Sequence, residues 1–181
     1  MLKTLTLIRH TKPDISPGIC YGKMDINVAE NFTDEAAQVS SWLGPTDLII
    51  TSPLLRTLRL AEYLASRHQC ELRSHPGLME MHFGDWEGRA WNDIPRGEIN
   101  AWNADLMHYT PPNGESVQQL MQRVKVMLQE LMLLPQQHIV IVAHGGSIRA
   151  VLAQLAAIQL SQTMSWQIDY GAVIGVSRYR L

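Results

Sequence analysis

The sequence predicts an α/β fold: a three-layer sandwich in which a mostly parallel central sheet carries helices on both faces. Two observations support this. Short apolar runs typical of buried strands, among them residues 5–8 and 139–142, alternate with longer segments of helical periodicity. Such alternation favours a parallel sheet that is covered on both sides. At 181 residues the chain is long enough to bury a full core, so we expect one domain over residues 1–181.

Three strands and two helices are predicted in the first half of the chain. The strands cover residues 2–8, 47–51 and 70–73. The helices are indicated by apolar faces, formed by Phe32, Ala36, Val39 and Leu43 in the first and by Leu54, Leu58, Ala61 and Ala65 in the second. We expect Ser52 to be the N-cap of the second helix and Pro53 its first residue, because these residue types favour those positions.

The second half of the chain continues the same alternation. Residues 80–112 show weak periodicity, and we expect them to form an excursion that covers the functional site, with a helix around residues 94–105. The remaining predicted elements are a strongly amphipathic helix over residues 116–134, a strand over 139–142, a helix over 147–157 and a strand over 172–177.

Composition and charge exclude several classes of protein. The formal net charge of −2 argues against general attraction to nucleic acid or to an anionic membrane. Cys20 and Cys70 form no CxxC pair, so we expect reduced thiols, as in the cytoplasm. The first apolar run is too short for a signal peptide, and no stretch approaches the roughly 18 apolar residues of a membrane span. These features predict a cytoplasmic protein and leave its oligomeric state open.

Two histidines stand where predicted strands end. His10 follows the first strand, after Arg9, and His144 follows the strand at residues 139–142, ahead of Gly145. Because the carboxyl ends of parallel strands open into one crevice, we expect these groups to face each other there. The arginine and the unobstructed backbone suit that crevice to an anion. A single histidine at a strand end more often merely caps the strand, so neighbouring residues decide between the two interpretations.

Two further residues favour the functional interpretation. Arg56 lies about one turn into the helix after the 47–51 strand, where its guanidinium and the helix N-terminus both attract a phosphate or a carboxylate. Glu80 begins the loop of residues 80–88 and provides a carboxylic acid. A metal site is not indicated, because the sequence has neither HExxH nor clustered carboxylates. A serine nucleophile elbow is not indicated either, because Arg149 stands where GxSxG requires glycine.

Four segments along the chain carry a family resemblance. They are residues 9–10 (RH, compared with RHG), 52–56 (SPLLR, with SPLxR), 80–88 (EMHFGDWEG, with ExxFGxWEG) and 142–146 (VAHGG, with VxHGG). In this order they resemble the signatures of the histidine phosphatase superfamily, the phosphoglycerate-mutase-like proteins. Together they span the chain and are highly specific. The resemblance implies the phosphoglycerate-mutase-like α/β fold and an enzyme that needs no metal and no cofactor.

The resemblance also implies roles for six residues. His10 would attack phosphorus and become a phosphohistidine, which water then cleaves. Glu80 would protonate the leaving alkoxide and later take a proton from the attacking water. A nucleophilic imidazole must be neutral, and surrounding cations favour that state. The phosphate itself would be held by Arg9, Arg56, His144 and Gly145.

Some positions depart from the family pattern. Thr11 replaces the usual glycine after the histidine, and Lys12 replaces an acid that often follows. The carbonyl of Thr11 is still available to fix the tautomer of His10, so we expect activity to be retained. Arg59 and Leu60 replace a glutamine and a threonine, and no role is carried over to them.

The substrate is suggested by the loops. Residues 9–13, 18–22 and 112–116, with Asp25, resemble the branch of the superfamily that removes the 5′-phosphate of alpha-ribazole phosphate in cobalamin assembly. This implies a small-molecule phosphomonoester with a flat base. The candidates for contact with it are Tyr21, Gly22, His82 and Trp86. Tyr21 and Trp86 can equally well pack their loops onto the body of the protein.

Two other kinds of function stay open. A phosphoglycerate mutase, or a broad-specificity sugar or nucleotide phosphatase, would use the same histidine. The mutases of the family are longer than this chain, so hydrolysis is expected. A non-catalytic phosphate-binding module would be expected to have lost His10, Glu80 or an arginine, and all of these are present.

Overall fold

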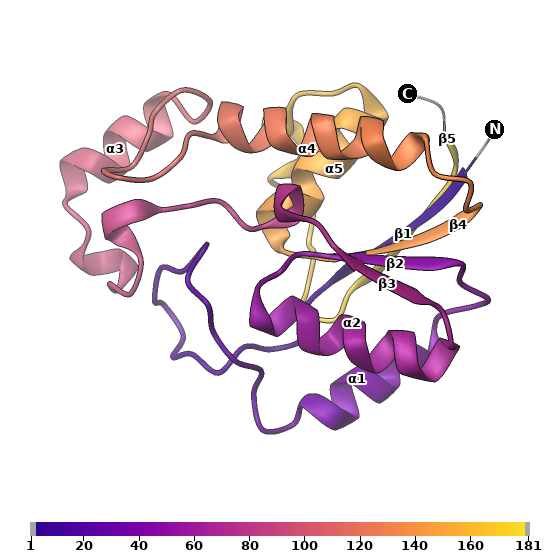
Figure 1. Cartoon of the computed structure of the whole chain (residues 1–181). Helices are drawn as coiled ribbons and strands as arrows, with labels where there is room; N and C mark the ends of the chain where they lie inside the picture. The colour runs from indigo at the N-terminus through magenta and orange to yellow at the C-terminus, as the bar shows by residue number, and fades with distance from the viewer. Residues whose placement is uncertain (1–2, 180–181) are drawn as a thin grey trace.

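The computed structural model describes residues 3–179 and contains a five-stranded sheet in the order β3-β2-β4-β1-β5 (Figure 1). The strands are β1 (Lys3–Arg9), β2 (Leu48–Thr51), β3 (Glu71–Ser74), β4 (His138–Ala143) and β5 (Val173–Tyr179). Neighbouring strands pair in parallel, except that β5 runs antiparallel to β1. The mostly parallel sheet predicted from the sequence is confirmed.

Helices cover both faces of this sheet. They are α1 (Phe32–Ser41) and α2 (Leu55–His68) on one face, and α4 (Val117–Met132) and α5 (Gly145–Ala156) on the other (Figure 1). Successive residues of a strand point to opposite faces. In β4, Ile139 and Ile141 accordingly pack with α4 and α5, whereas Val140 and Val142 pack with α1 and α2. The predicted three-layer sandwich is therefore also confirmed.

The register of the central strands determines what meets at the carboxyl edge of the sheet. β1 and β4 pair with Arg9 opposite Ala143, so the next residues, His10 and His144, leave the sheet side by side. β2 ends with Thr51 opposite Val142, one residue before β4 ends. The residues that follow β1, β2 and β4 are thus brought together at this edge.

The start of α2 differs from the prediction. The helix begins at Leu55, with Leu54 as N-cap and no side-chain cap, so the N-cap role expected for Ser52 is wrong, as is the start at Pro53. The backbone at Leu54 is extended, with φ of −69° and ψ of 139°. Ser52 accepts only a long hydrogen bond, 3.3 Å, from the Leu54 amide, because its hydroxyl lies against His144.

The expected excursion projects beyond the carboxyl edge of the sheet, at the left of Figure 1. It contains the helix α3 (Arg96–Ala104), close to the predicted position. The short 3-10 helices of the chain are Pro76–Leu78, Gly84–Trp86, Trp91–Asp93 and Leu160–Thr163. α4 begins after Ser116, which caps it reciprocally with Gln119. Over residues 3–179, none of the helices combines the length and the apolar character required to cross a lipid bilayer.

We expect a buried leucine of α4 to contribute strongly to stability. Leu128 is 0% exposed, and Leu128→Ala should lower the free energy of unfolding by about 2–5 kcal/mol through lost burial and the cavity left behind. Leu133, just beyond the same helix, is 86% exposed, and Leu133→Ala should change it by less than about 0.5 kcal/mol. Urea unfolding of both variants, followed by circular dichroism, measures the difference. Equal losses would contradict the packing described for α4.

Candidate active site

His10 lies buried at the carboxyl edge of the sheet, with 1% of its surface exposed. Its Nδ1 lies 2.7 Å from the Thr11 carbonyl oxygen, so the Nδ1–H donates there and Nε2 keeps its lone pair. The expected use of the Thr11 carbonyl is therefore found. Burial, and after it the charge of Arg56, holds the pKa of His10 well below its usual value. The ring is neutral at physiological pH.

His144 faces His10, and the two ring centroids are 5.2 Å apart. It is fully buried, and its Nε2 lies 2.8 Å from the hydroxyl oxygen of Ser52. Its Nδ1 is buried at the start of α5, where the His144 side chain faces the backbone amide of Ser147. Burial, together with the charge of Arg56, lowers the pKa of His144 far below its usual value. The site thus contains two neutral imidazoles in contact.

Arg9 is held in place from the segment that precedes β5. Its Nη1 donates to the Ile168 carbonyl at 2.7 Å, and its guanidinium lies 4.0 Å from the centroid of the Tyr170 ring. The same ring is 5.5 Å from that of His10. The Nε of Arg9 is buried without a partner in the described part of the chain. Part of the guanidinium is therefore free to bind a ligand.

Arg56 is fully buried and is held by the loop after β1. It donates to the carbonyls of Met24 at 2.7 Å and Gly22 at 2.6 Å. A Cβ at Gly22 would lie 1.8 Å from the Met81 carbonyl oxygen, so only glycine fits at this position. Gly22 therefore lies at the site through its backbone. Burial lowers the pKa of Arg56, whereas the nearby Glu80 carboxylate acts in the opposite direction.

Tyr21 also lies beside this cluster. Its ring centroid is 5.3 Å from the Arg56 guanidinium, and its hydroxyl lies 2.6 Å from that of Tyr170. The two tyrosines thus join the loop after β1 to the segment before β5. Tyr170 was not among the residues predicted from the sequence, because the segment before the last strand carries no family signature.

Glu80 occupies the N-terminus of α5. One carboxylate oxygen accepts from the Gly146 amide at 2.8 Å, and the other accepts from the Ser147 amide at 3.1 Å and from the Met81 amide at 2.9 Å. A Cβ at Gly146 would lie 2.4 Å from the carboxylate, which explains the glycine there. The helix N-terminus favours this negative charge. Glu80 is therefore held at the same edge as the two histidines.

Arg123 of α4 supports the segment that carries Glu80. It donates to the carbonyls of Gly77 at 2.8 Å, Met79 at 2.7 Å and Glu80 at 3.0 Å. Its guanidinium also pairs with Glu115 at 2.6 Å. Sequence reasoning missed Arg123, because an arginine in an amphipathic helix usually marks the solvent face. The one available signal was that Arg123 follows Glu115, an acid of the 112–116 segment, by eight residues.

A cavity of about 290 Å³ opens beside Glu80. Its polar end is formed by Arg9, Glu80, Gly145, Gly146 and Arg149. Its apolar walls come from Met81, Phe83, Trp102, Leu106, Val117, Leu120, Leu160 and Met164. These apolar residues were not predicted as site residues, because their spacing resembles that of ordinary core positions. A ligand held at the polar end would extend into an apolar space.

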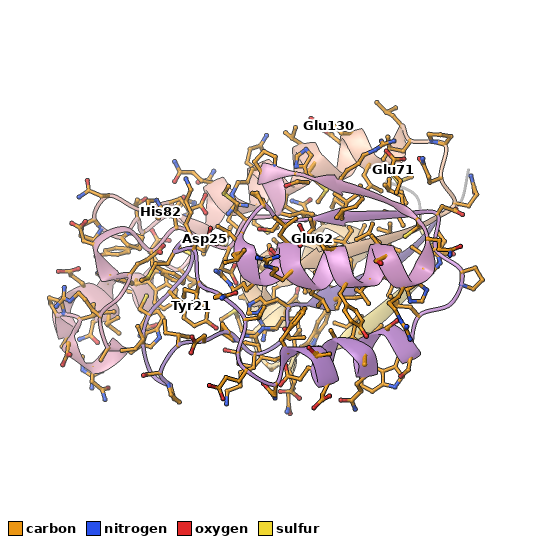
Figure 2. All side chains as sticks on the ribbon, turned by 60° about the horizontal axis from the view of Figure 1, so that its bottom comes forward. Tyr21, Asp25, Glu62, Glu71, His82 and Glu130 are labelled. Atoms are coloured by element: carbon orange, nitrogen blue, oxygen red, sulfur yellow. The ribbon has the colours of Figure 1, made fainter. Side chains whose placement is uncertain are left out.

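None of the four predicted substrate contacts, Tyr21, Gly22, His82 and Trp86, lines this cavity. Trp86 is fully buried, donates to Glu98 at 2.6 Å and stacks on Tyr109 at 6.0 Å between centroids. Of the two interpretations, its surroundings match packing of the loop. The His82 amide donates to Glu115 at 2.9 Å. Figure 2 shows its side chain at the same end of the molecule as Tyr21, but it does not line the cavity.

The assembled groups can both bind an anion and react with it. Two guanidinium groups and a helix N-terminus lie around a neutral histidine, and the carboxylate of Glu80 lines the cavity. Within residues 3–179, no three histidine, cysteine, aspartate or glutamate side chains come close enough to ligate one metal ion.

Comparisons with known proteins give this arrangement a family. The chain is 30% identical over 175 residues to the adenosylcobalamin/alpha-ribazole phosphatase of Escherichia coli (strain K12), covering 92% of this chain and 86% of that protein. It is 30% identical over 168 residues to a glucosyl-3-phosphoglycerate phosphatase of Mycobacterium tuberculosis (strain ATCC 25618 / H37Rv), covering 84% and 75%.

Solved structures and a family match agree with these relatives. The crystal structure of the alpha-ribazole phosphatase from Shigella flexneri superposes with a TM-score of 0.87 and 28% identity, over 95% of this chain and 89% of that one. Residues 5–180 match the family described as the histidine phosphatase superfamily (branch 1). The chain therefore belongs to the histidine phosphatase superfamily.

Proposed function

We propose that the chain is a phosphomonoester phosphatase in which His10 forms and then releases a phosphohistidine. The observation that carries the proposal is the state of His10. Its Nδ1–H donates to the Thr11 carbonyl, which directs the Nε2 lone pair toward the anion site. A neutral imidazole with one fixed tautomer is the form in which histidine is a nucleophile.

The phosphate site is proposed to consist of Arg9, Arg56, His144 and the amide of Gly145. The Nε atoms of Arg9 and Arg56 are buried without partners in the described chain, so donors remain for the phosphate oxygens. Gly145 is the first residue of α5, whose N-terminus attracts negative charge. Fixed donors of this kind stabilise the charge on the phosphoryl group during transfer. The proposal includes no metal and no cofactor.

Glu80 is proposed as the general acid and base. Glu80 first takes a proton from the phosphate monoester monoanion as it binds. Nε2 of His10 then attacks phosphorus while the bond to the leaving oxygen breaks, and Glu80 gives that oxygen the proton. Water then attacks the phosphohistidine, Glu80 takes its proton, and inorganic phosphate leaves with His10 restored. Glu80 is well placed for this, because it lines the cavity that would receive the leaving group, together with Arg9 and Gly145 of the proposed phosphate site.

The leaving group is proposed to be alpha-ribazole, whose flat base would occupy the cavity. The cavity beyond Glu80 has two aromatic walls, Phe83 and Trp102, and mostly aliphatic and methionine walls elsewhere. Such walls favour a flat base over a charged glycerate or serine, which would lose its hydration there. The relatives named as alpha-ribazole phosphatases support the same substrate.

The first experiment measures phosphate release in EDTA from alpha-ribazole phosphate, nucleoside monophosphates, sugar phosphates and phosphoglycerates. We expect alpha-ribazole phosphate to have the highest kcat/KM, and His10→Ala to abolish turnover of every substrate while the fold is retained. Broad and weak turnover would keep the phosphatase and contradict the substrate. Binding without release would favour a non-catalytic module, and transfer between phosphoglycerates would favour a mutase.

Removal of the Glu80 acid should affect poor leaving groups most. Glu80→Gln should reduce kcat for an alkyl phosphate by about 10²–10⁴-fold, because the alkoxide needs a proton as it leaves. The loss for p-nitrophenyl phosphate should be much smaller, because p-nitrophenolate leaves without one. Steady-state kinetics on the two substrates measures the ratio. Equal losses on both would show that Glu80 has another role.

Because the pKa of His10 is lowered, we expect its ring to stay neutral at pH values where an ordinary histidine is protonated. An ordinary histidine becomes protonated as the pH falls through about 6.5, whereas a lowered pKa keeps the ring neutral below that value. An NMR titration of the His10 ring in the free protein should therefore show no protonation midpoint at or above about 6.5. The unfolded protein in denaturant provides the reference. A midpoint equal to that of the unfolded chain would contradict the burial described for His10.

A further inference from the structure

A carboxylate of α1 lies on the far side of the peptide group that holds His10. The carbonyl of the peptide between Thr11 and Lys12 accepts the Nδ1–H of His10 at 2.7 Å. The N–H of that same peptide donates to Oε2 of Glu35 at 2.9 Å. A trans peptide directs its C=O and N–H in opposite directions, so the imidazole and the carboxylate lie on either side of one planar group. Each direction of donation is unambiguous, because a carbonyl only accepts and an amide N–H only donates.

Both ends of this chain of hydrogen bonds are held in place. Oε1 of Glu35 accepts from Nδ2 of Asn31 at 2.7 Å, and the Glu35 amide donates to the Asn31 carbonyl at 3.2 Å. The carbonyl of Lys12 accepts from the Ala29 amide at 3.0 Å, which fixes the peptide from its other side. Glu35 lies outside the four segments that carry the family resemblance, so its link to His10 becomes visible only in the fold.

The carboxylate strengthens the hold of the peptide on the imidazole. Hydrogen bonds in a chain polarise one another, so a negative acceptor at the N–H makes the carbonyl a better acceptor at its own end. His10 and Thr11 are 1% and 0% exposed, so little water competes for the bond between them. Burial and the charge of Arg56 lower the pKa of His10, whereas the hydrogen bond to Thr11 acts to raise it. The polarised carbonyl therefore favours a positive ring where the arginines oppose one.

We propose that Glu35 is a positioning residue for the nucleophile: acting through the 11–12 peptide, it holds the His10 ring and stabilises the positive charge that the ring acquires as Nε2 attacks phosphorus. This rests on the proposed function, in which His10 becomes a phosphohistidine. Nδ1 keeps its proton when Nε2 bonds to phosphorus, so the ring becomes positive, and it is neutral again once water has cleaved that bond. No proton passes to Glu35. In Ser-His-Asp triads a carboxylate has the same effect on a histidine by direct contact.

A neighbouring acid provides the matched control. Asp34 precedes Glu35 in the first turn of α1 and carries the same charge. It is exposed, and within the described residues it makes no hydrogen bond to the loop after β1. Asp34→Ala and Glu35→Ala therefore change the net charge and the start of the helix alike, and they differ at the 11–12 peptide.

The hydrogen bond is measured first, by proton NMR of the free protein without substrate. The chemical shift of an N–H proton moves upfield as its hydrogen bond weakens. We expect Glu35→Ala to move the Nδ1–H signal of His10 upfield and Asp34→Ala to leave it in place, and His10→Gln identifies the signal. This measurement does not depend on whether the chain is a phosphatase.

The rate of phosphoryl transfer from p-nitrophenyl phosphate in the first turnover is measured next, with the Kd for inorganic phosphate. Glu35→Ala should lower the rate by about 3–10-fold, which corresponds to one hydrogen bond. The Kd should not change, because the charge on the ring develops only during the attack. Glu35→Gln keeps an acceptor without the charge. It should show about half of that loss on a logarithmic scale, since bonds to charged groups are about twice as strong. Asp34→Ala should change neither quantity.

Three results would overturn the proposal. One is an unmoved Nδ1–H signal of His10 in folded Glu35→Ala, whatever its rate. Another is a moved signal with an unchanged rate of phosphoryl transfer. The third is a loss of equal size in Asp34→Ala. If Glu35→Ala does not fold, Glu35→Gln supports the same three comparisons. If the signal moves as expected while the unmodified protein hydrolyses no phosphomonoester, the proposed function fails and the hold of Glu35 on the His10 ring is supported.

Discussion

The parallel pairing of β1 with β4 is the constraint on which the site depends. Each residue of one strand lies opposite a residue of the other, so both strands end together and their next residues are the two histidines. A shift of register by one residue would turn the side chains of a strand to the other face. Each face of β4 packs against its own pair of helices, so a shifted strand would have to fit its isoleucines and valines into the opposite, differently shaped core. Core packing therefore determines the distance between the two imidazoles.

Burial of positive charge is the main cost of this arrangement. Arg56 is fully buried, and an unpaired buried charge is expensive. The protein offsets the cost with backbone carbonyls, from the loop after β1 for Arg56 and from the segment before β5 for Arg9. Carbonyls hold the guanidiniums without neutralising them, so the site keeps its attraction for an anion. The same charges help to keep both histidines neutral.

Much of this could be predicted from the sequence. Strand and helix positions followed from periodicity, and the carboxyl-edge position of the histidines followed from the two apolar runs before them. The start of α2 could not be predicted, because serine before proline is a common helix start and its contact with His144 spans the fold. Arg123, Tyr170 and the walls of the cavity were missed for the same reason. Their roles arise from contacts between distant segments, which leave no local pattern.

The position of β1 between β4 and β5 has a consequence for synthesis of the chain. β1 is synthesised before the other strands of the sheet, yet its two partners are β4 and β5, which follow it by more than a hundred residues. Until those strands emerge, an apolar strand and its histidine have no neighbours in the sheet, and such segments are prone to aggregate. The nascent chain thus carries an incomplete site until β4 and β5 have both been synthesised.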